Sequence, residues 1–188
     1  MREFIVAVRV FIVLTILTGV LYPLAVTGIA QAAFKDKANG SLIVQDGKTV
    51  GSHLIGQAFD DPKYFWSRPS ATSPVAYNAA SSSGSNLSAT NPALQEAIVA
   101  RVKALREADP AQKAAVPTEL VTTSASGLDP HISPAAAEYQ APRIARLRGK
   151  SVDEIKRLIQ KHTVGPDLGV LGESVVNVLE LNLDLDKK

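Results

Sequence analysis

The sequence has no cysteine, three histidines and few aromatic residues. Without cysteine the chain can form neither a disulfide framework nor a thiolate zinc site, and it has no thiol nucleophile. The histidines, His53, His131 and His162, are far apart and lack the paired helical spacing of zinc ligands, so we expect no bound metal. The 188 residues are enough for one domain and an accessory segment.

The chain also has no large excess of positive or negative charge. Beyond Arg2, Glu3 and Arg9 the chain carries 18 basic and 17 acidic residues. A protein that binds nucleic acid through counterion release normally has a clear basic excess. We therefore expect no nucleic-acid partner.

Residues 10–34, VFIVLTILTGVLYPLAVTGIAQAAF, contain no charged residue. As a helix this segment is roughly 37 Å long, which exceeds the hydrocarbon core of a bilayer. It predicts a transmembrane helix, with residues 1–9 in the cytoplasm and residues 35–188 in an extracytoplasmic domain. The orientation rests on a small excess of positive charge before the span. A cleaved signal peptide, with Ala30-Gln31-Ala32 as its cleavage site, is the alternative.

Small and ring-containing residues interrupt this apolar segment. Pro23 removes one helical hydrogen bond and predicts a kink. Tyr22, Gly19 and Gly28 favour contact with neighbouring helices over contact with lipid alone. Tyr22 and Pro23 are therefore candidates for a partner interface within the membrane.

The first part of the predicted domain contains a turn signal and a polar loop. Asp46-Gly47 separates the apolar runs 42–44 and 54–55, which predicts a β-hairpin. Residues 67–92 then hold eight serines and have almost no apolar periodicity. This composition is typical of a loop or linker, and disorder remains an open alternative.

Three helices follow. Asn91-Pro92 begins the first, whose apolar face carries Leu94, Ile98, Val102 and Leu105 and which ends near residue 108. Ser133-Pro134 begins the second, which carries Tyr139, Ile144 and Leu147 and ends at Gly149. A capping box, Ser151 with Glu154, begins the third, which buries Val152, Ile155, Leu158 and Ile159.

The last segment alternates strictly, with leucines at 179, 181, 183 and 185 and polar residues between them. This period of two predicts a half-buried strand. Strands first, helices in the middle and a strand last predict an α+β domain, a small sheet with helices on one side, behind the single transmembrane helix.

The segment LVTTSASGLDPHISP, residues 120–134, brings Ser126, Asp129 and His131 close together in sequence. An exported serine hydrolase using these three residues is one hypothesis. The G-x-S-x-G elbow is absent, however, and a triad is defined by spatial roles. A simpler interpretation is a short β-prone run at 121–123 followed by turns and the Ser133 cap, in a structural or partner-binding loop.

Other segments suit subunit contacts better than chemistry. YFWSRPSAT, residues 64–72, places Trp66 beside Arg68, an apolar and cationic pair that fits either an interface or ordinary packing. SGSNLSATNP, residues 83–92, offers donors and acceptors around Asn86 and Asn91, and GLDPHIS does so around Asp129 and His131. SSSGSN lacks the lysine and the following apolar helix of a P-loop.

Seven segments, in order along the chain, resemble the C subunit family of the Kdp high-affinity potassium-transporting ATPases. They are TGVLYPLAVTGIAQ (18–31), ANGSLI (38–43), GSHLIGQAF (51–59), YFWSRPSAT (64–72), SGSNLSATNP (83–92), VTTSASGLDPHIS (121–133) and VVNVLELNL (175–183). One departure is Glu173-Ser174-Val175, where the family often has Glu-Pro-Arg.

The resemblance implies a non-catalytic subunit of the inner membrane. Its implied partners are a channel-like potassium-translocating subunit, a P-type ATPase subunit and a small single-helix subunit. ATP and potassium act at the complex, and no cofactor is implied for this chain alone. The family is also described as a catalytic chaperone that raises the pump's ATP affinity through a glutamine, which corresponds to Gln140 here. With an extracytoplasmic domain, that effect is indirect.

Overall fold

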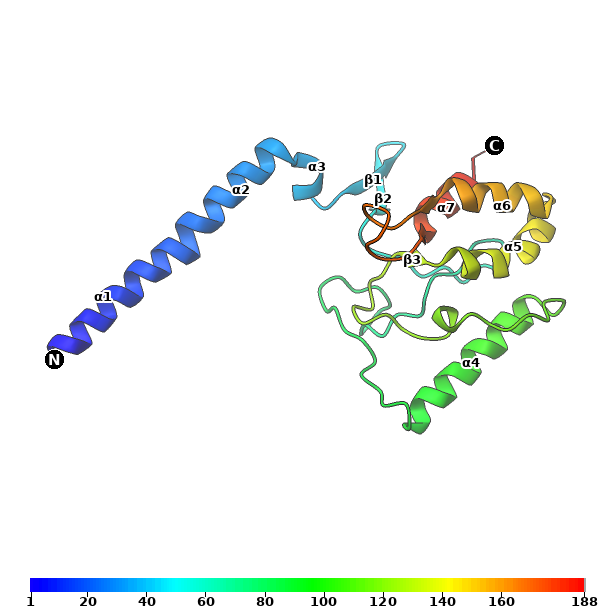
Figure 1. The fold of residues 1–188 in the computed structure, drawn as a ribbon, viewed down its shortest axis with the longest axis horizontal. Helices are drawn as coiled ribbons and strands as arrows, with labels where there is room; N and C mark the ends of the chain where they lie inside the picture. Colours follow the sequence, from blue (N-terminus) through cyan, green and yellow to red (C-terminus); the bar gives the residue numbers. More distant parts are fainter. Residues whose placement is uncertain (188) are drawn as a thin grey trace. The chain divides into compact units, whose positions relative to one another are not determined.

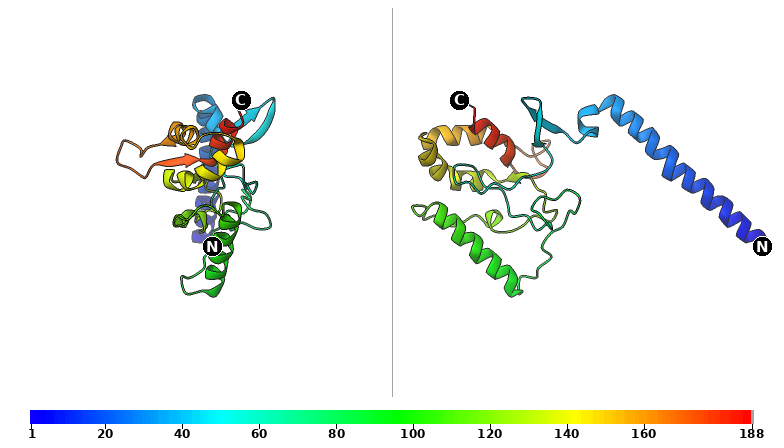
Figure 2. Two further views of the ribbon diagram at one scale, coloured as in Figure 1. Left: turned by 90° about the vertical axis from the view of Figure 1, so that its right-hand side faces the viewer. Right: turned by 180° about the vertical axis from the view of Figure 1, so that it is seen from behind.

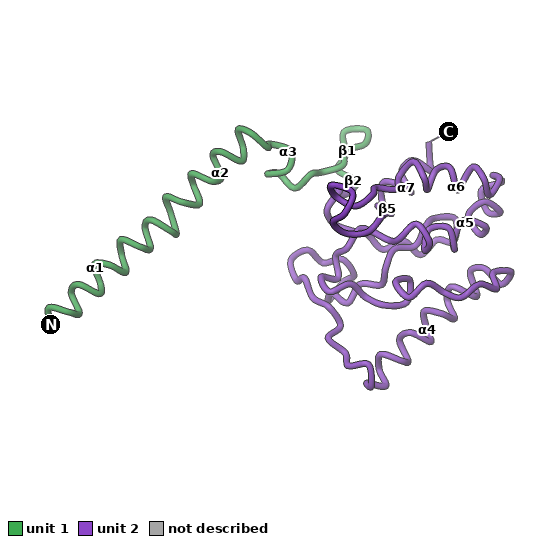
Figure 3. The backbone as a smooth tube through the Cα atoms, in the orientation of Figure 1, with its two compact units in different colours: residues 1–50 green, residues 51–188 purple. Residues whose placement is uncertain are grey.

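The computed structural model describes residues 1–187, which divide into two compact units, unit 1 over residues 1–50 and unit 2 from residue 51 onward (Figure 3). Unit 1 holds a long helix, a helical turn and most of a β-hairpin. Unit 2 is a mixed domain with a small three-stranded sheet and several helices. One apolar helix followed by a mixed helix and sheet domain confirms the coarse architecture predicted from the sequence.

The long helix of unit 1 consists of α1 (Arg2–Ile16), a π-helical turn (Leu17–Leu21) and α2 (Tyr22–Ala33). Together they are long and apolar enough to cross a membrane. Pro23 lacks the N–H that would bond the carbonyl of Gly19, and the π-helical turn contains Gly19. The ribbon therefore runs from α1 into α2 without a sharp break, and the kink predicted at Pro23 is wrong (Figure 1).

A pair of amide side chains closes the end of this helix. Gln31 and Asn39 exchange hydrogen bonds of 3.3 and 3.2 Å, and the Asn39 amide also donates to the Lys35 carbonyl. These bonds fold the short helix α3 (Lys35–Ala38) back against the last turns of α2. The turn between the apolar helix and α3 is therefore held by side-chain hydrogen bonds.

The predicted hairpin is present, although its second strand lies earlier than predicted. Strand β1 (Leu42–Gln45) pairs with β2 (Lys48–Ser52) across Asp46-Gly47. Both turn residues have positive φ, +50° and +75°, as a two-residue hairpin turn requires. The apolar run 54–55 follows β2, and only Ile55 forms an isolated bridge, to Ser52.

The sheet of unit 2 is antiparallel, in the order β3 (His131–Ile132), β5 (Val175–Asn177) and β4 (Thr163–Val164). Ile132 and Thr163 both pair with Val176, which is fully buried at the centre. Short strands cannot bury a core by themselves, so most of the apolar surface comes from the helices packed on the sheet.

The three predicted helices are confirmed as α4 (Pro92–Ala108), α5 (Pro134–Arg148) and α6 (Val152–Lys161). Asn91, Ser133 and Ser151 cap them as expected, and Ser151 with Glu154 forms the capping box. The predicted β-prone run at 121–123 forms no strand, because Val121 lies in a turn and Thr122 in a bend, directly after a 3₁₀ turn (Thr118–Leu120). Val152, which was predicted to be buried, is 37% exposed.

The predicted C-terminal strand over 179–185 is wrong, because these residues belong to helix α7 (Val178–Leu185). The Asn177 side chain accepts a hydrogen bond from the Glu180 amide and caps this helix. The buried residues of this helix are Val178, Leu179, Leu181, Asn182 and Leu185, and the spacings of three and four among them are those of one helical face. Leu181 and Leu185, which are four residues apart, belong both to the alternating pattern and to one helical face. A segment of eight residues is therefore too short to distinguish the strand period from the helical period.

Figure 1 shows α5, α6 and α7 gathered around the sheet, with α4 on the other side of the connecting loops. The core contains Phe65, Ile132, Ile144, Ile155, Val176 and Leu181, each at most 1% exposed. Phe65 comes from a segment without helix or strand. Its burial therefore has to be explained by the side chains that hold this segment.

Candidate functional site

Two buried amide side chains hold the backbone of residues 64–66 in the way that a neighbouring strand would. Asn182 accepts from the Phe65 amide at 2.9 Å and donates to the Phe65 carbonyl at 2.9 Å. Gln140 accepts from the Trp66 amide at 2.8 Å and donates to the Trp66 carbonyl at 3.1 Å. Because an unpaired buried backbone group is costly, these amides make it possible for Phe65 to enter the core.

We call the side chains that hold residues 64–66, Gln140, Asn182 and Arg143, the clamp. Arg143 is 2% exposed. Its guanidinium donates to the carbonyls of Pro62 and Tyr64, at 2.8 and 3.1 Å, and to Gln140 Oε1 at 2.7 Å. It also lies over the Trp66 ring, 4.7 Å from the centroid. Burial lowers the pKa of Arg143 to about 10, so the side chain remains a cation at neutral pH.

Gln140 is 1% exposed, and both polar atoms of its side chain are hydrogen-bonded within the chain. Oε1 accepts from Trp66 and Arg143, and Nε2 donates to Trp66 and to the Ala136 carbonyl. A nucleotide could reach this amide only after the clamp had opened. The geometry makes Gln140 a packing residue in this conformation.

The serine-rich segment 67–92 lacks helices and strands until α4 begins, but it is tied to the loop 121–130 rather than being a free linker. Ser83 donates to the Ser126 carbonyl at 2.9 Å, and the Ser70 hydroxyl donates to the Gly127 carbonyl at 2.7 Å. Gly127 has φ +68°, and a Cβ there would lie 2.5 Å from the Ser83 oxygen. The two loops therefore approach too closely for any larger residue at 127.

Arg68, Asp129 and His131 form a partly buried polar cluster at the side of these paired loops. Arg68 donates to Asp129 Oδ2 and to the Thr123 carbonyl, both at 3.3 Å. The His131 amide donates to Asp129 Oδ1 at 3.0 Å. Burial raises the pKa of Asp129, but the hydrogen bonds from His131 and the charge of Arg68 outweigh it, so the pKa lies below its usual value.

The arrangement of a serine hydrolase is not formed by these residues. The Ser126 hydroxyl accepts from the Leu128 amide at 3.1 Å and contacts the Ser124 hydroxyl at 3.4 Å. His131 Nδ1 lies 3.5 Å from Asp129, but within residues 1–187 no hydrogen bond joins His131 to Ser126. Ser126 therefore stabilises a turn, with no base placed to activate it.

The remaining interface candidates take different positions. Trp66 is packed by Arg143, and its indole N–H donates to the Asp61 carbonyl at 3.1 Å. Asn91 is used as the cap of α4, whereas Asn86 is exposed with φ +51°. Tyr22 is 67% exposed on the apolar helix, next to Pro23.

Sequence reasoning missed Asn182 and Arg143. Asn182 was predicted to lie on the solvent face of a strand. It instead lies on the buried face of α7, the helix that Asn177 caps. Arg143 is an arginine in the middle of an amphipathic helix, which normally indicates a solvated residue. In neither case does the local pattern reveal a partner about 80 or more residues away in sequence.

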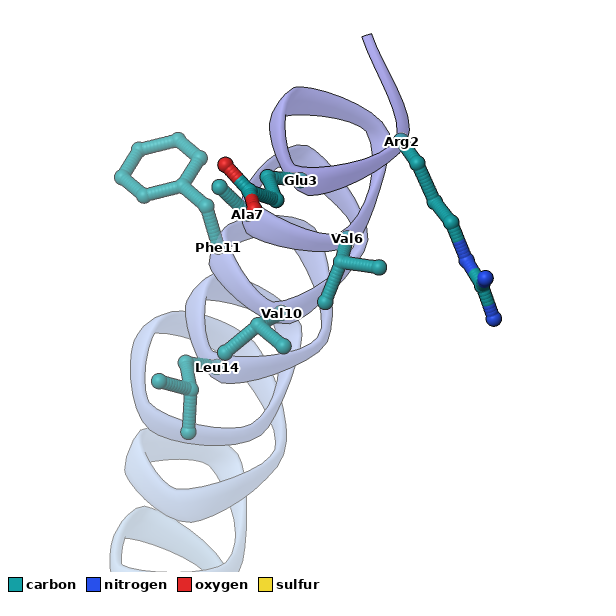
Figure 4. A pocket seen from close by; sticks show the side chains of 7 residues that line it. All are labelled: Arg2, Glu3, Val6, Ala7, Val10, Phe11 and Leu14. Atoms are coloured by element: carbon teal, nitrogen blue, oxygen red, sulfur yellow. The ribbon is translucent and has the colours of Figure 1, made fainter.

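The described residues form no metal site, and the hollow along α1 is not an enclosed ligand site. Among residues 1–187 no group of three or more histidine or acidic side chains is placed to hold a metal ion. A large hollow follows α1 from Arg2 to Leu14, but Figure 4 shows that its lining side chains all project from successive turns of that one helix. Such an open surface fits contact with lipid or with another helix better than a bound small molecule.

An apolar helix long enough to cross a membrane, followed by a domain whose buried polar side chains hold its own backbone, indicates a membrane-anchored protein. The chain matches the family described as "K+-transporting ATPase, c chain" (KdpC) over residues 4–187, and it belongs to this family. Relatives with the name "Potassium-transporting ATPase KdpC subunit" include proteins of Polaromonas naphthalenivorans, 61% identical over 96% of this chain and 92% of the relative, and of Dechloromonas aromatica, 60% identical over 96% and 94%. A third, from Sorangium cellulosum, is 62% identical over 96% and 95%.

Proposed function

We propose that this chain is the non-catalytic, membrane-anchored subunit of an ATP-driven potassium uptake pump, and that it assembles with and stabilises the pump's other subunits. The observation that carries this proposal is the family match over residues 4–187, together with relatives near 60% identity that are named as subunits of a potassium-transporting ATPase. The apolar helix Arg2–Ala33 supplies the anchor.

The partners in this proposal are a channel-like potassium-translocating subunit, a P-type ATPase subunit and a small single-helix subunit. The N-terminus lies in the cytoplasm, and the domain lies on the extracytoplasmic side of the inner membrane. The positive charges of Arg2 and Arg9, at the N-terminal end of the helix, support this orientation. ATP and potassium then act on the other subunits.

Any effect of this subunit on ATP affinity is transmitted through the complex. The burial of Gln140 and the complete use of its amide within the clamp support this view over direct nucleotide contact. A subunit that binds one pump conformation more tightly than another shifts the equilibrium between them, and ligand affinity changes with it.

Purification of the complex tests the proposal. A tagged full-length chain, expressed with the other subunits in a host that lacks its own pump, is expected to bring them down and to give potassium-stimulated ATPase activity. The same preparation without this chain should lose most of that activity. Full activity and a stable complex in its absence would contradict the proposal.

A further inference from the structure

One loop of unit 2 exposes a cluster of large apolar side chains. The apolar loop, residues 164–172, connects β4 to β5 and carries Val164, Leu168, Val170 and Leu171. Their exposed fractions are 62, 91, 80 and 60%. Scattered single apolar residues are normal on a surface, but four within nine residues form a patch of the kind that marks an interaction site.

The apolar loop is held in shape by its own backbone. Asp167 and Leu171 exchange two hydrogen bonds, of 2.8 and 2.9 Å, and form an isolated bridge. Leu168 has φ +53°, which is uncommon for a residue other than glycine. A backbone fixed in this way presents its side chains with little further ordering on binding.

The base of the loop is fixed as well. Val164 pairs with Val175 of β5, the central strand of the sheet, and the next residue, Val176, is fully buried. Seen from the side in the left view of Figure 2, this orange segment extends away from the helices of unit 2. The loop is thus a rigid projection with an apolar tip.

The charges of the loop indicate what kind of surface covers it. Between residues 163 and 174 the only charged residues are Asp167 and Glu173, and there is no tryptophan, tyrosine, lysine or arginine. Segments that dock on membrane surfaces normally carry aromatic anchors and basic residues, because headgroups are often anionic. An acidic apolar loop fits a protein surface with the opposite charge.

We propose that the apolar loop docks into an apolar groove edged by lysine or arginine residues on another subunit of the same pump. This inference rests on the proposed function and adds the surface through which it operates. Leu168 and Val170 enter the groove, while Asp167 and Glu173 face its basic edge. The occupied groove is part of the extramembrane surface of the partner subunit.

Photo-crosslinking in the intact complex tests this proposal. A benzophenone amino acid replaces Leu168 in the tagged full-length chain, and the control places it at Val99, an exposed apolar residue of α4. Light is expected to join position 168, and not position 99, to another pump subunit. No protein crosslink at 168, or a crosslink to a second copy of this chain, would overturn the inference.

Substitutions in the loop give an independent measurement. The double variant L168D/V170D is expected to bring down at least tenfold less of the other subunits than V99D, with an unchanged unfolding midpoint because both side chains are exposed. The charge reversal D167K/E173K should also weaken capture of the subunits. If it instead leaves capture unchanged and strengthens binding to vesicles of anionic phospholipid, the loop is a membrane contact and the inference fails.

The two proposals fail in distinguishable ways. If the unmodified chain brings down the other subunits but position 168 gives no crosslink and L168D/V170D assembles normally, only the docking inference is wrong. If the unmodified chain does not bring them down at all, the proposed function is wrong, and the inference that depends on it is wrong as well.

Discussion

Gln140 and Trp66 are joined by two hydrogen bonds, in which the Trp66 amide donates to Oε1 at 2.8 Å and Nε2 donates to the Trp66 carbonyl at 3.1 Å. A side-chain amide has the same donor and acceptor as a peptide group, so it can replace a neighbouring strand. Asn182 does the same for Phe65. The segment 64–66 is thus held by α5 and α7 in place of a sheet.

We predict that Gln140→Ala destabilises the protein by about 2–4 kcal/mol, because it leaves buried groups of Trp66 and one Arg143 donor without partners. Gln160→Ala, at an exposed position of α6, is the matched control and should cost less than about 0.5 kcal/mol. Denaturant unfolding of the full-length chain in detergent measures both. Equal midpoints for the two variants would mean that the clamp contributes nothing.

A second prediction concerns ATP. If Gln140 acts by packing, then Asn182→Ala, which opens the same clamp from α7, should change the pump's ATP dependence as much as Gln140→Ala does. The measurement is ATPase activity of the assembled complex against ATP concentration. A weaker apparent ATP affinity in the Gln140 variant alone, at equal stability, would favour direct contact with nucleotide.

The success of sequence reasoning followed the range of the interactions involved. Helix caps at Asn91, Ser133 and Ser151 are local, so the sequence revealed them. The turn at Asp46-Gly47 is also local, because both residues must adopt positive φ. The apolar helix follows from composition alone.

Long-range pairing explains what could not be predicted. Asn182 looked like a surface residue because its partner, Phe65, is 117 positions away. The loops 67–92 and 121–130 looked like separate polar segments because the hydrogen bonds that join them connect positions far apart in the sequence. The supposed strand at 179–185 failed because alternation and the helical period overlap in so short a segment.

A third prediction concerns acid stability. Asp184, whose side chain is 9% exposed, accepts from Lys161 at 2.7 Å, His162 at 2.9 Å and Lys187 at 3.1 Å. The hydrogen bonds from Lys161 and then His162 hold the pKa of Asp184 well below its usual range. A carboxyl whose pKa is lower in the folded state stabilises the fold above its unfolded pKa of about 4, and this contribution is lost as the pH falls further.

Asp184→Asn should therefore cost about 1–3 kcal/mol at pH 7, and the difference from the parent chain should shrink steadily below about pH 4. Asp60→Asn, at an exposed position, is the control. Thermal unfolding of the full-length chain between pH 3 and pH 7, in steps of about half a unit, gives the curve. A difference that stays constant with pH would show that the charge of Asp184 is not the source of the stability.

A fourth prediction separates the loop 121–130 from catalysis. Because Ser126 Oγ accepts from the Leu128 amide and is hydrogen-bonded to no histidine within residues 1–187, Ser126→Ala should cost no more than about 1 kcal/mol and leave the pump's ATPase activity unchanged. A fluorophosphonate probe should not label the chain. Labelling that disappears in both Ser126→Ala and His131→Ala would revive the hydrolase hypothesis.

The fifth prediction concerns orientation, and the absence of cysteine makes it simple to test. Single cysteines at Glu3 and at Glu138, an exposed position of α5, can be treated in intact cells with a membrane-impermeant thiol reagent. We expect labelling at 138 alone, and at both positions after permeabilisation. Such a result puts Gln140, two residues away, across the membrane from ATP, so that any effect on ATP affinity must pass through the complex. Labelling at position 3 alone would reverse the orientation, and opening of the clamp toward the cytoplasm would then be the way in which Gln140 reaches nucleotide.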